Sequence, residues 1–99
     1  MFKELDPVLH SQLRLSIMSL LVGVRSAEFS FLEEKTGATR GNISVQLRKL
    51  EEAGYIEITK SFRKNYPLTT CSITKKGIAA FREYADALSD YIRQKPGSE

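Results

Sequence analysis

Apolar residues recur at helical spacing near the N-terminus. They follow three- and four-residue steps and are Val8, Leu9, Leu13, Ile17, Leu20 and Leu21. Before them, Asp6 can cap a helix, and Pro7 suits the first helical position because its missing N–H is not needed there. The pattern predicts an amphipathic helix from Asp6 to about Val22 or Val24, with Gly23 as a candidate terminator.

Two further helical patterns follow, separated by a turn. Ser30 and Glu33 have the spacing of a capping box, and Gly37 would end that helix after about two turns. Thr39 offers a second N-cap, and an apolar stripe then leads to a left-handed stop at Gly54; it consists of Ile43, Leu47 and Leu50. A short helix, a turn containing glycine and a longer helix predict a helix-turn-helix over about residues 30–54.

β-Branched and aromatic residues dominate the segments 55–59 and 68–74, which predicts two strands. Residues 60–67 between them contain the turn formers Asn65 and Pro67 and only positive charges, so we expect a basic loop. Together these segments predict a β-hairpin over about residues 55–74.

A last helix is predicted over about residues 75–94. Thr74 can cap it, and its apolar stripe consists of Ile78, Phe81, Ala85, Leu88 and Ile92. The expected fold is therefore mainly α with a small β-hairpin, in a single domain over residues 1–99.

Positive charge is concentrated in the second half of the chain. The 99 residues carry a net charge of +3, but the segment from Arg40 to Lys76 holds eight Lys or Arg and three Glu, so the remainder is net negative. Clustered positive charge favours a polyanionic partner such as nucleic acid.

Several classes of protein are disfavoured by composition. The apolar stretch from Ile17 to Val24 is too short to span a membrane, and the acidic N-terminus does not resemble a signal peptide, so we expect a cytoplasmic protein. A single cysteine, Cys71, and a single histidine, His10, allow neither an internal disulfide nor a metal cluster. We find no catalytic constellation and expect no cofactor and no enzymatic activity.

Motifs in the expected order resemble a known family. They are Leu5-Asp6-Pro7 with His10-Ser11, the segment 29–37, Gly41-Asn42-Ile43-Ser44 with the segment 47–55, and Thr74-Lys75-Lys76-Gly77. This chain resembles the compact winged-helix DNA-binding domains, relatives of the MarR and ArsR transcriptional regulators. The resemblance implies a winged helix-turn-helix in which the third helix enters the major groove, the hairpin forms a wing along the backbone or minor groove, and the terminal helices build a homodimer. Many relatives have a basic residue or histidine where this chain has Val45 and Gln46, so an operator sequence cannot be transferred.

Candidate DNA-reading residues lie on the outward side of the third helix. Its N-terminal part approaches base edges in such folds, which makes candidates of Arg40, Asn42, Ser44, Val45 and Gln46. Arg matches guanine, Asn or Gln matches adenine, and Val could contact a thymine methyl group. The plainer alternatives are that Asn42 braces the turn and that Ser44, Val45 and Gln46 are solvated. Thr39, Arg48 and Lys49 are assigned to phosphates, with a salt bridge from Arg48 to Glu51 or Glu52 as an alternative.

The wing candidates are Lys60, Arg63 and Lys64, with Arg63 or Lys64 at its tip. The alternative is a charged loop that only confers solubility. The dimer interface is assigned to apolar residues near the N-terminus and on the last helix, with packing inside one chain as the alternative and a mixture of both expected: Leu5, Val8, Leu9, Phe81, Tyr84, Leu88, Tyr91 and Ile92.

These observations predict a sequence-specific, double-stranded-DNA-binding transcriptional regulator that acts as a homodimer, with repression favoured over activation. A protein-interaction module with the same fold is the alternative. A small-molecule effector between the terminal helices and the DNA-binding part is a further hypothesis. We expect Cys71 and His10 to be packed residues rather than sensors.

Overall fold

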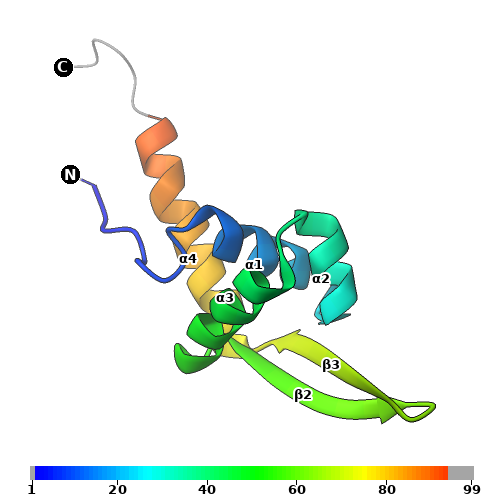
Figure 1. The fold of residues 1–99 in the computed structure, drawn as a ribbon. Coiled ribbons are helices and arrows are strands. Elements are labelled where there is room, and N and C mark those ends of the chain that lie inside the picture. The colour runs from blue at the N-terminus through cyan, green and yellow to red at the C-terminus, as the bar shows by residue number, and fades with distance from the viewer. Residues whose placement is uncertain (1, 94–99) are drawn as a thin grey trace, which may run out of the picture.

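The computed structural model describes residues 2–93. Its elements in chain order are α1 (Gln12–Val24), β1 (Ser26–Glu28), α2 (Phe29–Thr36), α3 (Arg40–Glu52), β2 (Ile56–Arg63), β3 (Tyr66–Ile73) and α4 (Lys75–Ile92). The strands form one antiparallel sheet in the order β1-β3-β2. Helices α1 to α3 form one group, the β2–β3 hairpin projects from it, and α4 extends away in another direction (Figure 1). The expected mainly α fold with a hairpin wing is confirmed.

Helix α1 begins later than the sequence pattern predicts. The side chain of Asp6 accepts a hydrogen bond from Val8 N at 2.9 Å, and its carbonyl accepts one from His10 N at 2.8 Å, so Asp6 organises a single turn. The chain then leaves the helical conformation at Ser11, which caps α1 anew. The predicted start at Asp6 is therefore wrong, whereas the end at Val24 is confirmed.

Helix α2 begins without the predicted capping box. Ser30 lies inside its first turn, and the N-cap position is occupied by Glu28, which makes no side-chain capping bond. Glu28 also ends β1, a three-residue strand that sequence reasoning missed and that pairs with β3 through Ala27 and Cys71. A segment this short has no periodicity of its own, and only its pairing with β3 defines it.

The turn chemistry around α3 agrees with prediction. Gly37 ends α2 in the left-handed conformation, with φ +72°, and Thr39 caps α3 by accepting a hydrogen bond from Asn42 N at 3.2 Å. At the other end, Tyr55 N donates to Leu50 O and Gly54 N to Glu51 O, the bond pattern of a Schellman motif. Gly54 has φ +83°, which explains why glycine suits this position.

The hairpin is longer and its loop shorter than expected. Strands β2 and β3 pair from Ile56↔Ile73 to Arg63↔Tyr66, and only Lys64 and Asn65 connect them. Both have positive φ, 50° and 68°, as a type I′ turn requires. The predicted loop over residues 60–67 is wrong, because residues 60–63 pair with residues 66–69 and leave only the two-residue turn unpaired.

One continuous core joins the three N-terminal helices, the sheet and the first half of α4. Its fully buried members are Leu9, Ile17, Met18, Leu21, Leu32, Ile43, Leu50, Ile56 and Cys71. Burial of each large aliphatic side chain contributes roughly 1.5–3 kcal/mol, which fixes α3 against α1 and the sheet. The base of α4 packs tightly at Gly77, which stands where an added Cβ would lie 2.2 Å from Tyr55 O.

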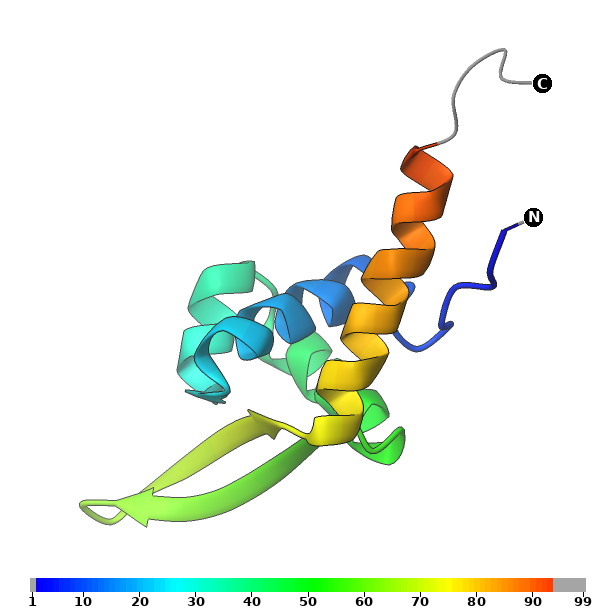
Figure 2. The ribbon, with the colours of Figure 1, turned by 180° about the vertical axis from the view of Figure 1, so that it is seen from behind.

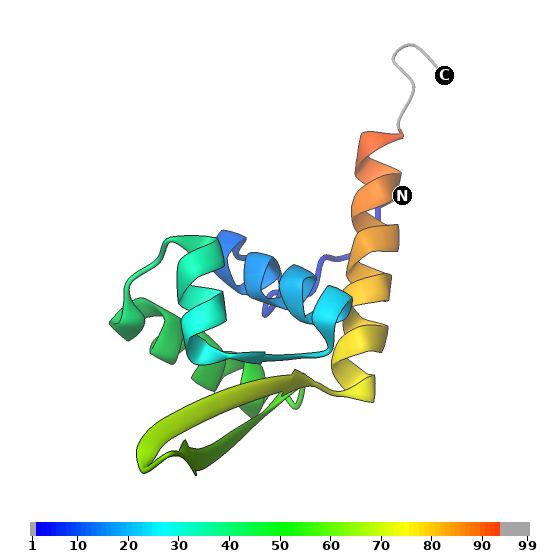
Figure 3. The same ribbon diagram turned by 90° about the vertical axis from the view of Figure 1, so that its right-hand side faces the viewer.

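The second half of α4 extends beyond this core, with the N-terminal segment beside it (Figures 2 and 3). Phe2 stacks on Tyr91 with ring centroids 4.5 Å apart, and Tyr91 Oη donates to Lys3 O at 2.9 Å. The end of α4 predicted near residue 94 lies outside the described residues; in the structure α4 ends at Ile92.

Candidate nucleic-acid interface

Helix α3 has one buried and one exposed side. Ile43, Leu47 and Leu50 face the core, as the sequence predicts. The opposite side is exposed and carries most of the predicted DNA-contacting residues: Thr39, Arg40, Asn42, Ser44, Val45, Arg48 and Lys49. Val45 is 45% exposed although it is apolar, which leaves its methyl groups available to a partner.

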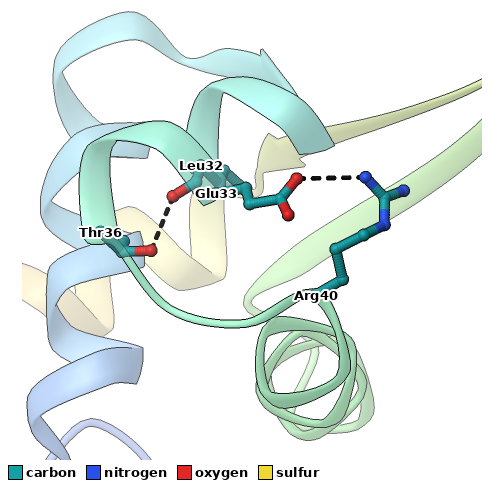
Figure 4. Close-up of polar contacts among 4 residues, drawn as sticks. All are labelled: Leu32, Glu33, Thr36 and Arg40. Carbon is teal, nitrogen blue, oxygen red and sulfur yellow. Dashed lines mark hydrogen bonds and ion pairs between the residues drawn. The ribbon is translucent and has the colours of Figure 1, made fainter.

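Arg40 is held by two contacts at the first turn of α3. Its Nη1 lies 3.1 Å from Glu33 Oε1 of α2 (Figure 4), and its guanidinium lies over the Phe29 ring, 4.7 Å from the centroid. At the end of α2 the Thr36 hydroxyl donates to Leu32 O at 2.7 Å, also shown in Figure 4. The side chain of Arg40 remains largely exposed, so these contacts direct the guanidinium without removing it from solvent.

Gln46 differs from the other candidates because it is half-buried and bonded at both ends of its amide. Its Oε1 accepts a hydrogen bond from Arg14 Nη1 at 2.6 Å, and its Nε2 donates to Asn42 Oδ1 at 2.9 Å. Sequence reasoning missed Arg14, which lies on α1 and is 32 residues away in the chain. No local pattern connects the two positions; only the packing of α1 against α3 does.

A groove lies between α3 and the wing, with a volume of about 600 Å³. It is lined by Phe29, Arg40, Ser44, Leu47, Arg48, Glu51, Ile58, Lys60 and Thr69. Lys60 shares a face of the hairpin with Ile58 and therefore points toward the α3 side. Three cations predicted to contact DNA, Arg40, Arg48 and Lys60, thus line one concave surface. Glu51 supplies the single carboxylate there.

The outer wing carries two further cations and two exposed aromatic rings. Lys64 lies in the turn itself, and Arg63, one residue before it, forms an ion pair with Glu28 at 2.5 Å. Phe62 and Tyr66 are 74% and 76% exposed and were not singled out in the sequence. Strand alternation places them on opposite faces of the hairpin.

The predicted dimer residues divide into two groups. Leu9 and Tyr84 are buried within the chain, so the core occupies them and they are not available to a second copy; Tyr84 Oη also lies 2.9 Å from His10 Nδ1. Leu5, Val8, Phe81 and Leu88 are half-buried, and Tyr91 and Ile92 are exposed. The accessible members lie on α4 and the N-terminal segment beside it.

Cys71 lies in the core and not at this interface. It is fully buried, and burial raises the pKa of its thiol from 9.0 to about 11, with a smaller contribution from the Glu51 charge. A thiol of this kind stays protonated near neutral pH and is a poor nucleophile.

Among the helices of residues 2–93, none has the length and apolar character that a membrane span requires.

Comparison with known proteins identifies the class. Residues 13–92 match the family of winged helix DNA-binding domains, and the chain belongs to that family. Its fold and family are those of transcriptional regulators, not of enzymes. The DNA-binding regulator class expected from the sequence is therefore confirmed.

Individual relatives agree with this assignment. The chain is 42% identical over 77 residues to an uncharacterized protein of Methanocaldococcus jannaschii. The matched segment covers 78% of this chain and 84% of the relative. A transcriptional regulator homologue from Pyrococcus horikoshii superposes with a TM-score of 0.81 at 29% identity, over 86% of this chain and 84% of its own. A mutant MarR from E. coli, solved with operator DNA, shares the fold with a TM-score of 0.73 at 12% identity, over 89% and 62% of the two chains.

Proposed function

We propose that this protein binds double-stranded DNA sequence-specifically as a homodimer and acts as a transcriptional repressor. The observation that carries the proposal is the groove between α3 and the wing, where Arg40, Arg48 and Lys60 face one concavity. Cations gathered at a concave surface complement a phosphate backbone. The alternative of a protein-interaction module is disfavoured by this charge.

In the proposed complex α3 lies in the major groove. Its exposed N-terminal half then brings Asn42, Ser44 and Val45 to base edges, and Thr39, Arg48 and Lys49 to phosphates. The wing follows the backbone or the minor groove with Lys60, Arg63 and Lys64. Gln46 contributes through its hydrogen bonds to Arg14 and Asn42.

The dimer is proposed to form along the projecting half of α4. Ile92 is 74% exposed and directly follows Tyr91, whose ring stacks on Phe2. An apolar surface therefore continues from α4 onto the N-terminal segment. A second copy would bury this surface and place two α3 helices about 34 Å apart, one helical turn of DNA. Repression follows if such a dimer acts by occupying its site.

DNA binding is tested by fluorescence anisotropy with the duplex upstream of the protein's own gene and a scrambled duplex, at several salt concentrations. Lys60→Ala should weaken binding to both duplexes and reduce the salt slope by about 1. Lys35→Ala is the matched control, because it also removes one positive charge, but from α2 and outside the groove between α3 and the wing. Absence of binding at low salt would refute DNA binding and favour the interaction module.

The dimer is tested by light scattering coupled to size-exclusion chromatography. Ile92→Glu should yield a monomer and weaken binding to a two-half-site duplex more than to a single half-site. Val24→Glu changes another exposed apolar residue, at the end of α1, and serves as the control. A wild-type protein that elutes as a monomer at micromolar concentration would refute the proposed interface.

A further inference from the structure

A continuous hydrogen-bonded relay runs from the N-terminal turn to the exposed side of α3. Val8 O accepts from Arg14 Nε at 2.5 Å, and Arg14 Nη1 donates to Gln46 Oε1 at 2.6 Å. Gln46 Nε2 then donates to Asn42 Oδ1 at 2.9 Å. The relay starts at the turn organised by Asp6 and ends one helical turn from the cap of α3.

The direction of this relay is fixed by chemistry. A guanidinium has only donors, so the atom of Gln46 that faces Arg14 must be its carbonyl oxygen. The Gln46 amide then turns its NH₂ group to Asn42, and the atom of Asn42 that accepts must in turn be Oδ1. Arg14 therefore sets the orientation of two amides whose oxygen and nitrogen ends would otherwise be interchangeable.

Asn42, the last residue of the relay, is the one that would contact DNA in the proposed complex. Asn42 is exposed, and within residues 2–93 its Nδ2 has no hydrogen-bond partner. The free donor of Asn42 is thus its NH₂ group, which can donate two hydrogen bonds, whereas its Oδ1 already accepts one bond from Gln46. In the major groove, guanine offers two acceptors, N7 and O6, whereas adenine offers one acceptor beside one donor.

We infer that Arg14 is a specificity-determining residue that acts through Gln46, and that it makes Asn42 select an acceptor-rich base edge, guanine, instead of adenine. The inference rests on the proposed function and deepens it. It also revises the expectation from residue type alone, which assigned Asn42 and Gln46 to adenine. Arg14 here is a positioning residue, since Asn42 makes the contact with the base.

The test is a selection from random duplexes with the full chain, followed by binding ratios for single-base variants of the selected site. Asn42→Ala identifies the position that Asn42 reads, because the preference there is lost and the others persist. At that position the wild type should prefer guanine over adenine by about tenfold or more.

Gln46→Glu reverses the direction of the hydrogen bond between residues 46 and 42. The new carboxylate still accepts from Arg14 but can only accept from Asn42, so the Asn42 amide turns over and presents its oxygen outward. The preference at that position should move from guanine to a base with an exposed amino group, adenine or cytosine. Lys49→Gln is the control, because it lowers the net charge of α3 by one unit, as Gln46→Glu does. It should weaken binding to all duplexes without changing the preferred base.

The outcomes separate the two proposals. If the wild type selects no sequence even at low salt, the proposed function fails and this inference fails with it. If the wild type selects a site and Gln46→Glu selects the same base at every position, sequence-specific binding stands and the relay does not set specificity. A preference of the wild type for adenine at the Asn42 position would overturn the inference as well.

Discussion

Arg63, next to the turn of the wing, forms an ion pair with Glu28 at the end of β1, with Nη2 and Oε2 2.5 Å apart. Thirty-five residues separate them in the chain. Because both side chains are more than a third exposed, the pair adds at most about 1 kcal/mol to stability. Its larger consequence concerns DNA, since a phosphate must replace this carboxylate before it can bind Arg63.

Removal of the carboxylate should therefore strengthen DNA binding. We expect Glu28→Gln to raise affinity by up to about fivefold at low salt, the equivalent of about 1 kcal/mol, and to change stability by less than about 0.5 kcal/mol. Anisotropy titrations measure the first and urea unfolding the second. Glu34→Gln removes a nearby carboxylate from α2 and serves as the control. Equal gains from both variants would show that net charge, and not release of Arg63, is responsible.

Gly77 should be essential for the packing of α4 against Tyr55 and Ile73. An added Cβ would lie 2.2 Å from Tyr55 O and 3.0 Å from Ile73 Cγ1, so Gly77→Ala must displace backbone. We expect a loss of about 1–3 kcal/mol in the free energy of unfolding, measured with urea. Gly23→Ala is the matched control, because its Cβ would meet nothing within 4 Å inside α1 and helix propensity favours alanine by up to about 1 kcal/mol. Similar values for both would contradict the close contact at Gly77.

Stability should decline at alkaline pH through Tyr55. Burial, and next the hydrogen bond to Asp6 Oδ2 at 2.5 Å, raise the pKa of the Tyr55 hydroxyl from 10.0 to about 12. The folded state therefore keeps the proton longer than the unfolded state, so stability from this group is present below pH 10 and is lost as the pH rises toward 12. Thermal unfolding should show a smaller decline between pH 10 and pH 12 for Tyr55→Phe than for wild type. Parallel declines would assign the effect to other groups, Cys71 among them.

Cys71 should react slowly with thiol reagents in the folded protein. Its side chain is fully buried, and its pKa, raised to about 11, leaves little thiolate near neutral pH. Labelling with iodoacetamide at pH 7.5 should accelerate by at least about tenfold in denaturant, where the thiol regains its ordinary pKa and is exposed. Rapid labelling of the native protein would revive a sensing role for this cysteine.

Local sequence signals predicted most of the fold. Thr39, Gly37 and Gly54 define the limits of the helix-turn-helix because capping and positive φ depend on the residue itself and its immediate neighbours. The stripe of Ile43, Leu47 and Leu50 assigned the buried side of α3, and with it the exposed side that carries the candidate DNA contacts. The same kind of signal misled at Asp6, where a cap supports one turn and not a helix.

Contacts between distant segments depended on tertiary structure alone. Strand β1 exists through its pairing with β3, and Arg63 meets Glu28 only because the wing and β1 belong to one sheet. Likewise, residue type offered Gln46 as a base reader, but the packing of α1 against α3 brought Arg14 to its amide. The sequence by itself determined which helices form and which face of α3 is exposed, because helix caps and helical periodicity are properties of neighbouring residues. The partners and orientations of the polar groups on that face were decided by the tertiary structure, because hydrogen bonds and ion pairs depend on distances that local sequence does not encode.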